Sequence, residues 1–195
     1  MTRTRTIIEQ SISLKKEIAA DSALLKKIEQ AAETITDAYK KGHRVFFCGN
    51  GGSAADAQHL AAELSGRFYF DRPPLAAEAL HVNTSYLTAV ANDYSYDLVF
   101  ARAAEAFCKE GDVLIGLSTS GNSRNVVKAF ETAKAKGSFT IALTGKGGGE
   151  MGKQCDILID VPSCDTPRIQ EAHIMIGHII CQFVEENLFG KGKEK

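Results

Sequence analysis

A histidine and a glutamate four residues apart are the first residues in this sequence whose types and spacing could do chemistry. His59 and Glu63 lie in an alanine-rich segment that is predicted to be helical. Residues at i and i+4 share one face of a helix, so this imidazole and carboxylate could bind one metal ion. Pairs of this kind are also common as plain surface contacts, and the spacing leaves both interpretations open.

A second pair, Gln170 and His178, lies on a long helix predicted near the C-terminus. At 3.6 residues per turn their side chains project on one broad side of that helix, roughly 80° apart about its axis. Gln170 and His178 can approach His59 and Glu63 only if the C-terminal helix packs beside the helix that carries the first pair. The sequence does not decide this. His173 is five positions from His178, points elsewhere and is predicted to be structural.

Two loops rich in glycine and serine have the composition of phosphate-binding loops. Gly49 to Ser53 reads GNGGS and Ser118 to Ser123 reads STSGNS, and each follows a predicted strand and precedes a predicted helix. Hydroxyl groups and the N–H groups of a helix start donate to phosphate oxygens, and glycine lets the backbone approach closely. Neither loop carries the pattern GxxxxGK[ST] or GxGxxG, which argues against a nucleotide or dinucleotide site in these loops. Simple capping of two helices is the alternative.

Strands and helices are predicted to alternate along most of the chain. The predicted strands are 44–49, 78–82, 112–118, 139–144 and 157–161, and the predicted helices are 53–64, 84–107 with a break near Asn92–Asp93, 122–136 and 167–188. This alternation indicates an α/β fold, a three-layer αβα sandwich around a flavodoxin-like five-stranded parallel sheet. In the expected strand order 2-1-3-4-5, strands one and three flank the topological switch point, so both loops open onto one crevice.

Residues 6–41 carry apolar side chains at helical spacing, with Asp21 as a cap between two helices. Their apolar faces pack either on the domain itself or in an oligomer interface, and both remain open. We expect a single domain over residues 1–195, with an N-terminal helical segment (1–41), an α/β core with the C-terminal helix (42–189) and a tail (190–195).

The composition excludes several classes of protein. A formal net charge of −1 gives no broad basic surface for nucleic acid. The five cysteines include no CxxC pair, which argues against a disulfide scaffold and a cysteine-rich zinc site and favours a reducing cytosol. No stretch approaches the roughly 18 consecutive apolar residues of a membrane span, and the first residues lack a signal-peptide pattern.

Five longer strings around these residues resemble phosphoheptose isomerases, which are sugar isomerase (SIS) domain proteins. They are CGNGGSAADAQHLAAELSGRF (48–68), AND (91–93), STSGNS (118–123), LTGKGGG (143–149) and RIQEAHIMIGH (168–178). The resemblance spans essentially the whole chain. It implies the SIS fold and interconversion of sedoheptulose 7-phosphate and D-glycero-D-manno-heptose 7-phosphate for lipopolysaccharide or related surface glycans. It further implies a cytoplasmic homotetramer, with the N-terminal helices used for oligomerisation and active sites at subunit interfaces.

The resemblance also implies roles for individual residues. Zn²⁺ would be held by His59, Glu63, Gln170 and His178, with Glu63 and His178 as the acid/base pair. The substrate-binding positions would be Asn50, Gly51, Gly52, Ser53, Arg67, Asn92, Asp93, Ser118, Thr119, Ser120, Ser123 and Gln170. Pro167 stands where some relatives carry an acidic residue, and a role for an acid there does not transfer to this chain.

Three other functions compete with this interpretation. One is a different sugar-phosphate isomerase, for an arabinose 5-phosphate or glucosamine-type substrate. Another is a non-enzymatic tetrameric scaffold like DiaA, which binds a replication initiator. The third is a sugar-phosphate-sensing regulator, against which the lack of a DNA-binding motif weighs. The full set of ligand and acid/base residues favours the enzyme.

Overall fold

The computed structural model describes residues 2–190, and most of the predicted tail (190–195) lies outside them. Five parallel strands form one sheet in the order β2-β1-β3-β4-β5, as the sequence predicts. The strands are β1 (Val45–Gly49), β2 (Ala77–Ala79), β3 (Val113–Ser118), β4 (Phe139–Thr144) and β5 (Ile157–Asp160). The helices are α1 (Arg3–Ala20), α2 (Ser22–Lys40), α3 (Gly52–Ser65), α4 (Thr84–Asp93), α5 (Val99–Phe107), α6 (Arg124–Ala135), α7 (Gly149–Gln154) and α8 (Thr166–Phe189), with a 3₁₀ turn at Tyr96–Leu98.

Helices cover both faces of the sheet, and alternate strand residues point to opposite faces. Phe47 on β1 packs in the core beneath α2, α3 and α8, whereas its neighbour Phe46 packs in the core beneath α4 to α7. Phe47 and Phe130 are almost completely buried in these two cores. Burial of such a side chain contributes about 1.5–3 kcal/mol relative to exposure. The predicted three-layer α/β fold is therefore confirmed.

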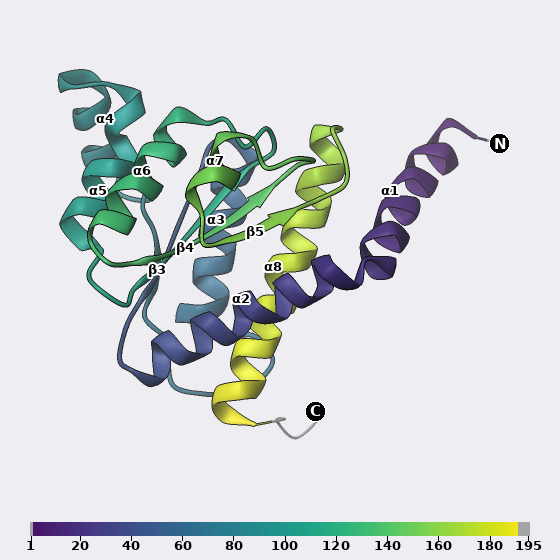
Figure 1. The fold of residues 1–195 in the computed structure, drawn as a ribbon, viewed down its shortest axis with the longest axis horizontal. Helices are drawn as coiled ribbons and strands as arrows, with labels where there is room; N and C mark the ends of the chain where they lie inside the picture. The colour runs from purple at the N-terminus through teal and green to yellow at the C-terminus, as the bar shows by residue number, and fades with distance from the viewer. Residues whose placement is uncertain (1, 191–195) are drawn as a thin grey trace.

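The two N-terminal helices differ in what they contact. Asp21 separates them as predicted, because its carboxylate caps α2 by accepting from the N–H groups of Ala23 and Leu24, each at 3.0 Å. α2 buries its apolar face against β5 and α8. α1 extends away from the body of the molecule (Figure 1), and only Leu14 and Ile18 near its end are buried.

The clearest differences from the sequence prediction concern three elements. The second strand ends at Ala79 instead of residue 82, because the chain turns there and Val82 N–H donates to the Ala79 carbonyl at 3.3 Å. The helix predicted from residue 122 begins at Arg124. The short helix α7 was not predicted, since its GGG start is typical of a loop.

Among the helices of residues 2–190, none combines the length and the apolar character that crossing a bilayer requires.

Candidate functional site

The first glycine loop connects β1 to α3 at the carboxyl end of β1, next to β3 in the sheet. Gly51 is the N-cap of α3 and has a φ of 56°, a left-handed conformation that favours glycine. A Cβ added to Gly49 would lie 2.6 Å from the carbonyl oxygen of Ser53, so the turn requires glycine there as well. The loop therefore ends at a helix start, whose first N–H groups lack intrahelical acceptors and are available to an anion.

The second loop, between β3 and α6, brings serine hydroxyls together. Ser118 Oγ lies 2.9 Å from Ser123 Oγ and 3.5 Å from Ser120 Oγ. The N–H of Asn122 donates to Ser120 Oγ at 3.1 Å. Ser118 is buried, whereas Ser120 is exposed and Thr119 is half-buried. This cluster of hydroxyls has the donors that a phosphate group needs.

An asparagine pair joins the two loops. Asn50 and Asn125 exchange two amide hydrogen bonds, of 2.9 Å and 2.8 Å. The hydroxyl of Tyr96 donates to Asn50 Oδ1 at 2.9 Å. Asn125 is almost fully buried and was missed in the sequence analysis, although it lies only two residues beyond Ser123. The pair fixes the first loop against the start of α6.

His59, Glu63 and His178 form a cluster that could hold a metal ion. Their ligand atoms all lie within 4.8 Å of one another. His59 Nε2 lies 3.0 Å from His178 Nε2 and 3.0 Å from Glu63 Oε1. Catalytic zinc sites commonly have three protein ligands of this nitrogen and oxygen type and leave a further position open. The donor set therefore fits such an ion.

Parallel packing of α3 and α8 brings these three side chains together. Gly177 allows the approach, because a Cβ there would lie 2.5 Å from Leu60 Cδ1. His178, the next residue on α8, thereby comes beside His59 on α3. The structure thus brings together two segments separated by 119 residues in the sequence.

Gln170 lies toward the other end of the α3–α8 contact. A Cβ added to Gly52 would lie 2.6 Å from Gln170 Nε2, so the amide rests against the first glycine loop. Eight residues of helix separate Gln170 from His178, about 12 Å along the axis of α8. Within one chain, Gln170 thus lies closer to the predicted substrate loop than to the histidine pair.

The remaining predicted site residues are exposed. Asn92 and Asp93 lie at the end of α4, where the Asn92 amide donates to Asp93 Oδ1 at 2.9 Å. Arg67 lies in the loop after α3. Their parts in the site stay predictions.

Asp56 is a half-buried carboxylate one turn before His59 on α3, and the sequence analysis did not identify it. The pKa of its carboxyl lies above the ordinary value, chiefly because burial disfavours the charged form. The imidazoles of His59 and His178 oppose this shift of the pKa.

A cavity of about 510 Å³ opens beside the cluster. His178 on α8, Lys15 on α1 and the rings of Phe68 and Tyr69 are among the residues that line it. His178 is therefore accessible from the side of α1, whereas His59 and Glu63 do not line this cavity.

Comparison with known proteins identifies similar sequences and structures. The SIS domain family model matches residues 8–145. The phosphoheptose isomerase of Clostridium acetobutylicum is 55% identical over 184 residues, which cover 94% of each chain. That of Aneurinibacillus thermoaerophilus is 54% identical over 93% of this chain and 92% of the relative.

Two solved structures have nearly the same fold over nearly the full chain. The phosphoheptose isomerase of Neisseria gonorrhoeae superposes with a TM-score of 0.88 at 42% identity, covering 94% of this chain and 97% of the other. That of Francisella tularensis superposes with a TM-score of 0.90 at 37% identity, covering 95% of this chain and all of the other.

Proposed function

This chain belongs to the phosphoheptose isomerase family of SIS domain proteins, and on that premise we propose that it is an aldose–ketose isomerase. Its reaction is the interconversion of sedoheptulose 7-phosphate and D-glycero-D-manno-heptose 7-phosphate. The product supplies heptose for lipopolysaccharide or related surface glycans. The observation that carries this proposal is the convergence of His59, Glu63 and His178.

The phosphate of the substrate binds to the two loops in this proposal. Ser118, Thr119, Ser120 and Ser123 supply hydroxyl donors, and Asn50 to Ser53 supply amide donors at the start of α3. The chain carries a net charge of only −1, so no global field attracts the anion. Local dipoles and hydroxyls must therefore provide the binding energy.

Glu63 and His178 are assigned the proton transfers. Isomerisation moves a hydrogen between C1 and C2 and a proton between the two oxygens. The Glu63 carboxylate takes the proton from the carbon next to the carbonyl, which leaves an enediol, and returns it to the neighbouring carbon. His178 passes the hydroxyl proton from one oxygen to the other, so no proton is gained or lost.

We assign His59, Glu63 and His178 as zinc ligands. Gln170 is assigned as a fourth ligand across the subunit interface, because within one chain it lies about 12 Å along α8 from His178. A Zn²⁺ ion held by these residues would polarise the sugar oxygens and stabilise the negative charge that develops on them. The contact of Gln170 with Gly52 supports its other proposed role, in substrate binding. Arg67, Asn92 and Asp93 complete the proposed set.

The active enzyme in this proposal is a cytoplasmic homotetramer of single-domain subunits, with active sites at the subunit interfaces. Exposed Ile7, Ile8 and Ile12 on α1 support an interface there, because three large apolar side chains on one extended helix lack a partner within the described chain. The isomerase names of the relatives favour the enzyme over the DiaA-like scaffold.

The proposal predicts that purified protein converts sedoheptulose 7-phosphate to the aldose, and that a metal chelator removes this activity. Glu63→Gln should lower kcat about 100- to 10,000-fold, as loss of a general base does. Conversion is measured by chromatography of the sugar phosphates. The control is Glu131→Gln, an exposed position on α6, which should leave kcat unchanged.

Two outcomes would count against the proposal. A wild type that fails to convert the ketose would favour the scaffold or another substrate. Full activity of Glu63→Gln, with the chelator still inhibiting, would refute the assignment of Glu63 as the base but leave the reaction intact.

A further inference from the structure

A buried ion pair lies just behind the candidate site. Arg72 Nε donates to Glu185 Oε1 at 2.8 Å, and the two side chains are only 2% and 0% exposed. Burying two charges has a large desolvation cost, and a well-packed apolar pair is often at least as stable. Stability alone therefore does not explain why this pair is present.

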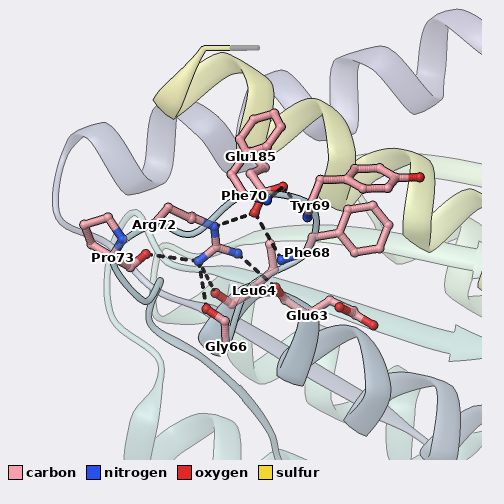
Figure 2. A network of polar contacts seen from close by, with 9 residues as sticks. All are labelled: Glu63, Leu64, Gly66, Phe68, Tyr69, Phe70, Arg72, Pro73 and Glu185. Atoms are coloured by element: carbon pink, nitrogen blue, oxygen red, sulfur yellow. Dashed lines mark hydrogen bonds and ion pairs between the residues drawn. The ribbon is translucent and has the colours of Figure 1, made fainter. Parts of the chain in front are cut away.

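The Glu185 carboxylate holds the loop that follows α3. It accepts hydrogen bonds from the N–H groups of Phe68 at 3.1 Å, Tyr69 at 2.7 Å and Phe70 at 3.2 Å. Figure 2 shows this loop wrapped around the carboxylate, with Arg72 on its other side. Glu185 thus fixes three consecutive residues of the loop to α8.

The Arg72 guanidinium holds the end of α3. It donates to the carbonyl of Glu63 at 2.9 Å, to that of Leu64 at 2.9 Å and to that of Gly66 at 3.3 Å (Figure 2). These carbonyls belong to the last turn of α3 and the residue after it. The last carbonyls of a helix have no N–H donors within the helix, so they need partners such as Arg72. Arg72 therefore ties the backbone of Glu63 itself to Glu185.

The same loop reaches the other half of the cluster. The rings of Phe68 and His178 lie 5.6 Å apart between centroids. Glu185 lies seven residues beyond His178 on α8, about two turns. The ion pair is therefore the junction of α3, the loop and α8, the elements that carry Glu63, Phe68 and His178.

We propose that Arg72 and Glu185 are positioning residues that set the separation of α3 and α8 at the His59–Glu63–His178 cluster. The expected effect on kcat rests on the proposed function. The expected effect on zinc affinity rests only on the geometry of the cluster. Charged, forked hydrogen bonds fix geometry more tightly than apolar packing does. A misplacement of about 1 Å in an active site can lower the rate about 100-fold.

The test compares Glu185→Gln and Arg72→Lys with the wild type. Each should lower kcat about 10- to 100-fold with KM for sedoheptulose 7-phosphate within about twofold, because phosphate binding lies at the other end of α3. Each should also weaken Zn²⁺ binding about 10- to 100-fold, as changes behind metal ligands do. Zinc affinity is measured by competition with a chromophoric chelator.

A destabilised control separates positioning from folding. Phe130→Leu changes a fully buried residue on the other face of the sheet, so it should lower Tm while kcat and zinc affinity at 25 °C stay at wild-type values. Wild-type zinc affinity and kcat in Glu185→Gln would overturn the proposal, as would losses no larger than those of Phe130→Leu. An inactive wild type would refute the isomerase proposal. The zinc affinities of the variants would still decide whether Arg72 and Glu185 are positioning residues.

Discussion

The two histidines of α8 have opposite surroundings although they lie five residues apart. His173 is completely buried, and its Nε2 pairs with the carbonyl of Thr144 at 3.1 Å. Its Nδ1 is buried without a hydrogen-bond partner among the described residues. Burial lowers the pKa of His173 to about 4, since desolvation disfavours the charged ring. His178 instead faces the cavity and the ring of His59.

The free energy of unfolding should therefore fall as the pH drops through the range where His173 titrates. The folded state keeps the ring neutral down to a pKa of about 4, whereas the unfolded chain binds the proton near pH 6.5. Below pH 6.5 the unfolded state binds more protons, so stability present at pH 7 is lost progressively toward pH 4. The total loss is about 3 kcal/mol at 1.36 kcal/mol per pKa unit.

Urea unfolding at fixed protein concentration between pH 7 and pH 4 measures this loss. His173→Gln should flatten the dependence on pH, because glutamine can still donate to Thr144 but does not titrate. Equal slopes in the two proteins would mean that other groups produce the acid sensitivity.

At the scale of residues, the sequence predicts functional groups that are close together in the chain. It does not predict contacts between residues that are far apart in the chain. The spacing of His59 and Glu63 predicts a shared face, and the structure places the two side chains 3.0 Å apart. Arg72 and Glu185 are 113 residues apart, and neither carries a motif. Their hydrogen bonds exist only because α3 and α8 pack side by side, which no local pattern specifies.

Among the elements, the contact of α3 with α8 determines whether the cluster forms. Glycine at position 177 lets Leu60 approach, since a Cβ there would lie 2.5 Å from Leu60 Cδ1 and 2.6 Å from Cδ2. Gly177 is buried inside a helix, where the usual preference is for alanine. Close packing is therefore the reason for glycine at this position.

Gly177→Ala should push the two helices apart and separate His178 from His59. Overpacking of this kind costs about 1–3 kcal/mol, which exceeds the helix propensity that alanine adds. Zinc affinity and Tm should both fall. Gly152→Ala on α7 is the control, because its added Cβ would lie 3.0 Å from the flexible tip of Leu158. A more stable Gly177→Ala protein with wild-type zinc affinity would contradict the packing explanation.

Most elements follow from sequence patterns, and the exceptions have tertiary causes. Long apolar runs such as Val113–Ser118 predict the central strands, which are buried on both faces. α7 escapes prediction because its helical state depends on Met151, which is fully buried in the core beneath α6. The order of the strands follows from a general rule for parallel sheets and is confirmed.

For the molecule as a whole, the least predictable feature is what covers α1. From the sequence, the apolar faces of both N-terminal helices could pack either on the domain or in an oligomer interface, and neither was favoured. α2 packs on the sheet, but Ile7, Ile8 and Ile12 on α1 are 43%, 54% and 46% exposed. A pattern of apolar spacing identifies a face that needs a partner, but it does not say whether that partner lies in the same chain.

The double variant Ile8→Glu/Ile12→Glu should dissociate the proposed homotetramer, because two carboxylates would have to be buried in the interface proposed at α1. Sedimentation should show a fall from about four times the 21.1 kDa chain mass, and isomerase activity should fall with it if the active sites form between subunits. Circular dichroism should be unchanged, since these side chains are exposed in the single chain. Glu17→Lys, an exposed position roughly 140° from Ile12 and roughly 180° from Ile8 about the helix axis, should leave the assembly intact. A double variant of unchanged mass would exclude α1 as the interface, because an assembly joined through other surfaces would not respond to charges on this helix.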